Sequence, residues 1–140
     1  MRAFRSGIAA VLVLLAGAVG WSGPNPAEYK RISQCVLVRE RQSLVGTKVQ
    51  LTGEFLGGGN FCYKVPKVNI HTKNYLCFAV GKTCIIRLYL KKDDPGMDLL
   101  FRLEPGDEVT AYGTFDYMGT DYNYMILDGI TVKKKSTAPP

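Results

Sequence analysis

The sequence predicts an all-β fold, a five-stranded Greek-key barrel with a short N-terminal helix and a short helix between the third and fourth strands. The pattern G-x-x-V-x-x-x-G-x-F occurs at residues 46–55 and again at residues 106–115. Alternation places the valine, the inner glycine and the phenylalanine of each copy on one face of a strand. Glycine on a buried face marks a bend or the close approach of another backbone. Gly53 and Gly113 therefore indicate two strands that curve at matching points, as in a small barrel.

The rest of the chain supplies three more strands. A glycine-rich turn and a long irregular loop, residues 57–74, lead to strands at residues 75–80 and 84–91, which we expect to be joined by a tight hairpin near Gly81. One or two helical turns follow at residues 97–103, then a type II turn at residues 104–107. The last strand covers residues 122–132, with a bulge at Asp128-Gly129. Five strands with a helix between the third and fourth are the signature of the OB-fold.

Hydrophobic alternation assigns the two faces of the third strand. Ile86, Leu88 and Leu90 share one phase and should face the core. The opposite phase, which we expect to be exposed, holds Arg87, Tyr89 and Lys91.

Three stretches carry a resemblance to a known family: LVGTKVQLTG at residues 44–53, GDEVTAYG at residues 106–113 and YMILD at residues 124–128. They resemble exported bacterial OB-fold proteins related to the tRNA-anticodon-binding-like domain. The resemblance covers roughly residues 44–135 and rests on turn and core residues, so it implies a fold and no ligand. The four cysteines and the glycine-rich first loop lie outside this pattern.

The N-terminus has the layout of a secretory signal peptide, which we assign to residues 1–20. Arg2 and Arg5 precede the apolar run of residues 7–20, and small residues end it. The alternative is an uncleaved anchor, but a spanning helix needs roughly 17–25 residues. We expect an exported protein, periplasmic or secreted, with no stable membrane insertion after cleavage. Residues 21–43 form a linker and a short helix, residues 44–132 the barrel, and residues 133–140 a disordered basic tail.

The cysteines are even in number, and export would bring them into an oxidising compartment, so two disulfides are expected. Zinc is the alternative, but it favours closely spaced cysteine pairs, and the single histidine, His71, joins no ligand cluster. We therefore expect neither a metal nor a cofactor.

Strand phase suggests how the four cysteines pair. Cys77 and Cys84 flank the expected hairpin and are the obvious pair. However, Cys84 shares the inward phase of the third strand, whereas Cys77 points outward if its neighbours face the core, and cross-strand partners must share a face. We therefore predict Cys62–Cys77 and Cys35–Cys84.

Charge is distributed unevenly. Residues 55–92 contain seven basic residues and no acidic residue, whereas residues 93–132 contain nine acidic residues and one basic residue. In OB-folds that bind oligomers, the second and third strands form the working surface, flanked by the first–second and fourth–fifth loops. The basic block falls on the first loop and on those two strands, interleaved with tyrosines. The alternative interpretation is a set of solvated faces and half-buried barrel aromatics. Arg39 and Arg41, upstream of this block, are expected to be solvated.

Two binding functions follow. The first is a non-catalytic module that binds a peptide, a protein or an oligosaccharide in a cleft between the first and last barrel loops. The alternative is binding of single-stranded nucleic acid or another polyanion on the basic face, although Asp116 and Asp121 on the facing loop would repel phosphates. An enzyme is not expected, because His71 has no recognisable partner motif. The candidate binding residues are Tyr63, Lys64, Lys67, Tyr75, Arg87, Tyr89, Lys91, Tyr117 and Tyr122.

Overall fold

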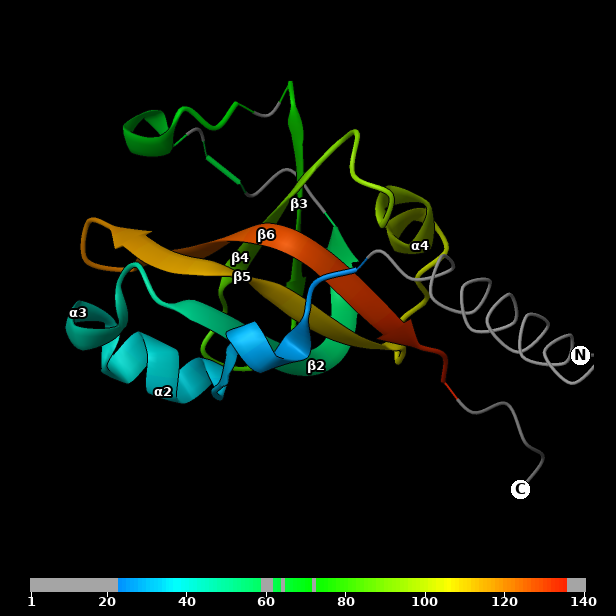
Figure 1. Ribbon diagram of the computed structural model, residues 1–140, viewed down its shortest axis with the longest axis horizontal. Helices are drawn as coiled ribbons and strands as arrows, with labels where there is room; N and C mark the ends of the chain where they lie inside the picture. The colour runs from blue at the N-terminus through cyan, green and yellow to red at the C-terminus, as the bar shows by residue number, and fades with distance from the viewer. Residues whose placement is uncertain (1–22, 59–61, 64, 72, 136–140) are drawn as a thin grey trace, which may run out of the picture.

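The computed structural model describes residues 23–58, 62–63, 65–71 and 73–135 (Figure 1). The expected signal peptide, Lys64 and residues 136–140 lie outside the described residues. Within them, no helix is long and apolar enough to span a membrane.

Five long strands close into a barrel, which confirms the predicted fold class. They are β2 (Lys48–Gly58), β3 (Tyr75–Val80), β4 (Arg87–Lys91), β5 (Glu108–Met118) and β6 (Tyr122–Lys133). The strand order is β2-β3-β4-β6-β5, and β5 pairs with β2 to close the barrel. The β4–β6 pairing is parallel, and the other pairings of the barrel are antiparallel. This is the OB-fold arrangement, with the short helix α4 (Met97–Phe101) between β4 and β5.

The barrel interior follows the predicted alternation. Ile86, Leu88 and Leu90 are fully buried, and Phe78 and Val80 of β3 face the same core. The remaining core side chains come from β2, β5, β6 and α4, whose Met97 and Leu100 are buried against the barrel, and from Leu37 and Leu44 of the N-terminal segment. Because one face of each strand is buried, a shift of one residue would expose the whole apolar set, and this fixes the register.

The two pattern glycines lie where strands approach each other. A Cβ atom added to Gly53 would lie 3.0 Å from Val80 Cγ2 and 3.2 Å from the backbone nitrogen of Gly81. At Gly113 it would meet the carbonyl oxygen of Ile126 and lie 2.8 Å from Leu127 Cα. The register of β5 and β6 shifts at this point, because Tyr112 pairs with Gly129 whereas Gly113 pairs with Leu127. Asp128 is thus the extra residue, and the predicted bulge is confirmed.

The N-terminal segment differs from the single helix that we expected. It comprises a 3₁₀ turn (Pro26–Glu28), the two-residue strand β1 (Lys30–Arg31) and two short helices, α2 (Gln34–Arg39) and α3 (Arg41–Leu44). The Ser33 side chain accepts a hydrogen bond from Val36 N and so begins α2. Strand β1 runs parallel to β2. A two-residue strand has no alternation to reveal it, and a neighbouring strand supplies its hydrogen-bond partners.

Two other expectations need correction. The β3–β4 connection is not a tight hairpin, because β3 ends at Val80 and β4 begins only at Arg87. Cys84 lies in this connection with a φ of 54°, outside the strand in which we placed it. The end of β6 continues into the first residue of the expected basic tail. Lys133 ends β6, and Lys134 Nζ and Lys135 N both donate to the buried carboxylate of Asp107.

The structure contains two disulfides, Cys35–Cys84 and Cys62–Cys77, the pairs that strand phase suggested. Their Cα atoms lie 5.0 Å and 6.2 Å apart, respectively. The first bridge ties α2 to the β3–β4 connection. The second ties the loop between β2 and β3, called here the first loop, to the outer face of β3.

Candidate functional site

The first loop lies over the outer face of the barrel. Its residues Val65 and Ile70 are buried, and they form a second apolar cluster with Cys77 of β3, Tyr89 of β4 and Tyr124 of β6. Val65 and Ile70 also bond to each other in a short antiparallel bridge. The loop thus covers part of the surface that OB-folds offer to ligands. Two predicted binding residues are buried in this cluster.

Those two residues are Tyr89 and Tyr122, which are 1% and 6% exposed. The Tyr89 hydroxyl donates to the carbonyl oxygen of Tyr63 at 2.8 Å and contacts the Tyr122 hydroxyl, which accepts from Tyr63 N at 2.9 Å. Burial, together with the hydrogen bond to Tyr122, raises the pKa of Tyr89. The expectation that Tyr89 is exposed is wrong, because the first loop covers the outer phase of β4.

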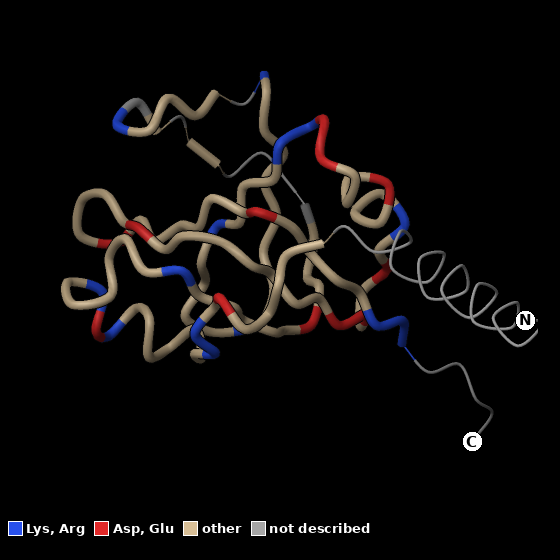
Figure 2. Tube along the Cα trace, viewed as in Figure 1, with Lys and Arg blue, Asp and Glu red and all other residues tan. Residues whose placement is uncertain are grey.

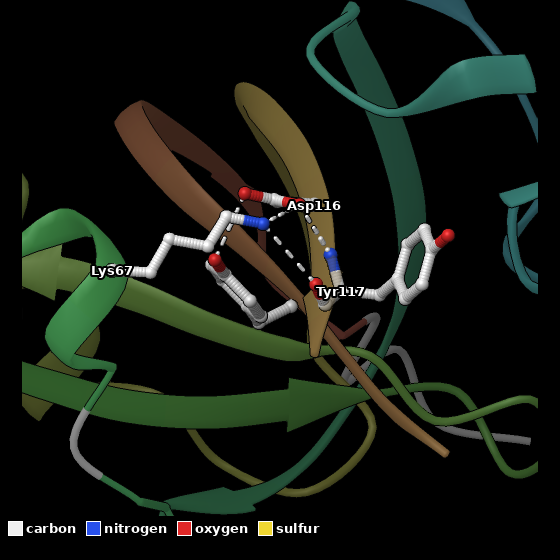
Figure 3. Close-up of polar contacts among 4 residues, drawn as sticks. Lys67, Asp116 and Tyr117 are labelled. Carbon is white, nitrogen blue, oxygen red and sulfur yellow. Dashed lines mark hydrogen bonds and ion pairs between the residues drawn. The ribbon is translucent and has the colours of Figure 1, made fainter. Parts of the chain in front are cut away.

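Lys67 joins the first loop to the far end of β5 (Figure 3). Its Nζ lies 2.9 Å from Asp116 Oδ1 and 3.5 Å from the carbonyl oxygen of Tyr117. The other oxygen of Asp116 accepts from the Tyr124 hydroxyl at 3.0 Å. Burial opposes ionisation of Asp116, but the hydrogen bonds from Lys67, Tyr117 N and Tyr124 outweigh it and lower its pKa. The ion pair therefore spans the gap between the first and last barrel loops, where we expected a cleft.

An open cleft lies on the opposite side of the β5–β6 turn, residues 119–121. In Figure 1 this turn lies between the first loop on one side and α3 on the other. The cleft has a volume of about 300 Å³. We call it the arginine cleft, and it is lined by Val38, Arg41, Cys84, Ile85, Arg87, Thr120, Asp121 and Asn123.

Each arginine of the cleft lies against a tyrosine. The guanidinium carbon of Arg41 lies 5.0 Å from the centre of the Tyr117 ring, and Arg41 Nη1 donates to the carbonyl oxygen of Thr120. The guanidinium carbon of Arg87 lies 4.8 Å from the centre of the Tyr122 ring. Such stacking restrains a long side chain and leaves the edge of its planar guanidinium free to donate hydrogen bonds. Both charged groups are thus held in place from two different elements, α3 and β4.

Two polar atoms of the cleft lack a partner among the described residues. Asn123 is only 4% exposed, and its Oδ1 accepts no hydrogen bond there. Arg87 Nε is also buried, and it donates no hydrogen bond within the described part of the chain. Buried polar groups are nearly always paired, so an unpaired acceptor and an unpaired donor on two residues that line one cleft indicate a ligand or ordered water beside them.

A second cleft, of about 480 Å³, lies where β3 begins and β4 ends. Its basic side chains are Lys73, Lys91 and Lys92, accompanied by Tyr75 and by the acidic Asp93. We call it the lysine cleft. Figure 2 shows that lysine and arginine positions are spread over several parts of the fold and do not follow one continuous face.

The structure therefore divides the predicted binding residues into several groups. Arg87, Tyr117 and Tyr122 surround the arginine cleft, and Tyr75 and Lys91 line the lysine cleft. Lys67 and Tyr89 hold the first loop in place, Tyr63 is 64% exposed on that loop, and Lys64 lies outside the described residues. The described residues of this set thus lie at several separate places on the barrel.

Sequence reasoning missed Arg41 and Asn123. The sequence predicts a solvated Arg41, because it follows a helix-like stretch that also contains Arg39, and only its contacts with Tyr117 and Thr120 set it apart. Nothing in the sequence distinguishes Asn123. His71 Nε2 lies 3.2 Å from Asn69 Oδ1. The described residues contain no group of three potential metal ligands.

No family model and no curated protein matches the chain. Several solved structures are similar to it in fold. An OBody bound to hen egg-white lysozyme has a TM-score of 0.54 and 15% identity, with 85% of this chain and 98% of that chain covered. Another OBody bound to the same protein has a TM-score of 0.53 and 13% identity, with 83% and 100% covered. A putative aspartyl-tRNA synthetase from Leishmania major Friedlin has a TM-score of 0.55 and 10% identity, with 82% of this chain and 23% of that chain covered. At such low identities the likeness concerns the OB-fold alone.

Proposed function

We propose that this chain is a non-catalytic binding module that holds a peptide or a segment of a protein in the arginine cleft. The observation that carries the proposal is the convergence of two guanidinium groups, each stacked on a tyrosine, with the unpaired carboxamide oxygen of Asn123. Sites that bind ligands combine a concave surface with a small number of placed polar groups. The arginine cleft has both.

A peptide matches the mixed chemistry of this cleft. Arg41 and Arg87 can only donate hydrogen bonds, whereas the side chains of Asp121 and Asn123 supply acceptors. Val38 adds apolar surface beside them. A peptide backbone carries donors and acceptors in alternation, so it can pair with both kinds of group. A phosphate chain offers acceptors alone and would face the carboxylate of Asp121.

The two disulfides support a place outside the reducing cytoplasm, because such bonds persist in oxidising compartments. We include export in the proposal on this ground. The similar OBody structures, each bound to lysozyme, support the idea that a barrel of this kind can serve as a protein-binding scaffold.

The proposal is tested with a library of free peptides, such as a tryptic digest of a proteome, passed over the immobilised oxidised protein. Retained peptides are identified by mass spectrometry for the wild type, for the Arg41→Ala/Arg87→Ala variant and for the control Arg102→Ala, which removes an exposed arginine at the end of α4. We expect the wild type and the control to retain a common set of peptides that the double variant loses. Retention of the same set by the double variant would refute the site.

The lysine cleft favours a second function, the binding of a polyanion such as single-stranded nucleic acid. Lys73, Lys91 and Lys92 gather there beside Tyr75, which lines the same cleft. Lysines that neutralise phosphates release counterions, so the affinity for an oligonucleotide should fall steeply as salt rises. Fluorescence anisotropy with a labelled oligothymidylate, with Lys91→Ala/Lys92→Ala as the variant, tests this. Affinity that is independent of salt, or unchanged in the variant, would exclude this function.

A further inference from the structure

We infer that the arginine cleft recognises the C-terminal carboxylate of a peptide, with the last backbone N–H bound to Asn123. This inference rests on the proposed function and narrows it to one chemical group.

The charges of the cleft residues determine the charge of the ligand that the cleft can bind. Arg41 and Arg87 bring two positive charges to a cleft in which Asp121 supplies one negative charge. Neither arginine forms an ion pair among the described residues. Guanidinium groups bind carboxylates through paired N–H donors, and this geometry is favoured where recognition must be planar and bidentate. An anionic group with at least two acceptor oxygens therefore matches the arginines.

The two unpaired atoms of the cleft residues define which hydrogen-bonding groups the ligand must carry. Asn123 Oδ1 is buried and needs a donor, whereas Arg87 Nε is buried and needs an acceptor. Leaving such groups unpaired is costly. The end of a peptide carries both complements close together, because the carboxylate accepts and the N–H of the same residue donates. One terminal residue can thus satisfy both orphaned atoms.

Other ligands of similar size lack the charge, the acceptor or the donor that the cleft residues require. A phosphodiester offers acceptors to the arginines but leaves Asn123 Oδ1 without a donor. A sugar hydroxyl can accept from Arg87 and donate to Asn123, but it leaves the guanidinium charges without a counter-ion. An internal peptide segment has the N–H and lacks the charge unless it contains an acidic side chain. The terminal carboxylate supplies all three features in a peptide of any sequence.

The test uses N-acetylglycine, which contains the carboxylate and the neighbouring N–H and nothing else of a peptide. The oxidised ¹⁵N-labelled protein is titrated while the Arg Nε–H and Asn side-chain signals are followed by NMR. N-acetylglycine should shift the signals of Arg87 and Asn123, which are assigned with the Arg87→Lys and Asn123→Asp variants. N-acetylglycinamide, which lacks the charge, should not shift them. Acetate, which lacks the N–H, should bind more weakly than N-acetylglycine.

Conservative variants give the second readout. Arg87→Lys keeps the charge and removes the Nε–H donor, so the affinity for N-acetylglycine should fall about tenfold or more, as expected for one hydrogen bond to a charged group. Arg102→Lys is the matched control and should bind as the wild type does. Preserved backbone spectra confirm that each variant is folded. Equal affinity of Arg87→Lys and wild type would overturn the inference.

The outcomes separate this inference from the proposed function. If peptides are retained through the arginine cleft but their C-terminal amides bind equally well, the function stands and the terminal carboxylate is excluded. If inorganic phosphate shifts Arg87 at lower concentration than N-acetylglycine does, the ligand is a phosphate and the inference is wrong. If no peptide is retained and no probe shifts Arg87, both proposals fail.

Discussion

Lys67 of the first loop and Asp116 of β5 form an ion pair across the outer end of the barrel, with 2.9 Å between Nζ and Oδ1. The lysine side chain is 55% exposed and the aspartate 14%. The first loop is held at the same time by the Cys62–Cys77 bridge and by its own residues Val65 and Ile70, which are buried against the outer face of the barrel. The magnitudes of these contributions decide which of them fixes the loop.

We predict that apolar packing outweighs the ion pair. Lys67→Met should lower the free energy of unfolding by less than about 1 kcal/mol, because exposed pairs are screened by solvent. Ile70→Ala should cost about 2 kcal/mol or more, because it leaves a cavity under the loop. Urea denaturation of both variants, with Lys73→Met as a control on the same loop, measures the difference. A larger loss in Lys67→Met than in Ile70→Ala would contradict this order.

Asp107 gives the protein an acid-dependent contact. Its carboxylate is buried at the end of the turn before β5, and it accepts hydrogen bonds from Lys134 Nζ at 2.6 Å, from Lys135 N at 2.8 Å and from Glu104 N at 3.0 Å. The bond from Lys134, followed by the two backbone bonds, lowers the pKa of Asp107 to about 2. The contact fastens the end of β6 to the start of β5.

We predict a loss of stability in acid that depends on Asp107. Its pKa is lower in the folded chain than the value of about 3.9 in the unfolded chain. The stabilisation is therefore fully present above the unfolded value and is lost as the pH falls through about 2. Asp107→Asn should be less stable at neutral pH and should lose less stability than the wild type between pH 5 and pH 2. Parallel urea titrations that show the same pH slope for both proteins would rule this out.

The fold was largely predictable because its signals are local. The alternation in residues 86–90 identifies the buried face of β4, and the glycine repeat identifies the strands that meet at Gly53 and Gly113. The burial of Tyr89 was not predictable in this way. The alternation places the Tyr89 side chain on the outer face of β4, and this side chain is buried only because the first loop packs over that face. Burial by residues that are distant in the sequence does not change the local alternation of apolar residues, so the sequence pattern cannot reveal it.

The candidate site was predictable only in part, for the same reason. Arg87 and Tyr117 were identified from the basic block and from the tyrosine-rich last loop. Their partners Arg41 and Asn123 come from α3 and from the start of β6. The four are brought together by the barrel and by the attachment of α3 to the β5–β6 turn. The Lys67–Asp116 ion pair lies between the loops where we expected a cleft, and no sequence feature indicated that these two residues meet.

The pattern glycines should differ in their tolerance of alanine. At Gly113 an added Cβ meets the Ile126 carbonyl oxygen and the Leu127 backbone, which cannot move without disturbing the bulge. At Gly53 the nearest atom is Val80 Cγ2, at 3.0 Å, on a side chain that can shift. We predict that Gly113→Ala costs about 3 kcal/mol or more and Gly53→Ala about 1 kcal/mol. Thermal or urea unfolding decides this, and a more stable Gly113→Ala than Gly53→Ala would refute the close approach.

The two disulfides should contribute different amounts to the free energy of unfolding. Cys35 and Cys84 are 49 positions apart, whereas Cys62 and Cys77 are 15 apart. In the chain-entropy model, bridges of these lengths stabilise the fold by about 4 and about 3 kcal/mol, respectively, with the larger value for the longer loop. Replacement of each pair by serine, followed by urea denaturation, should show losses in that order, with reduced wild type losing more than either.

Binding should respond more strongly to the Cys35–Cys84 bridge than to the Cys62–Cys77 bridge. Cys84 lines the arginine cleft, and its bond to Cys35 anchors α2, which α3 and Arg41 follow directly. Cys35→Ser/Cys84→Ser should therefore weaken the affinity for N-acetylglycine, because Arg41 is no longer held from both sides. Cys62→Ser/Cys77→Ser releases the first loop, which reaches the arginine cleft only through Tyr122 beside Arg87, and should weaken that affinity less than the loss of the Cys35–Cys84 bridge does. If the Cys62–Cys77 variant loses more affinity than the Cys35–Cys84 variant while both remain folded, the ligand contacts the first loop, and the arginine cleft is not the site.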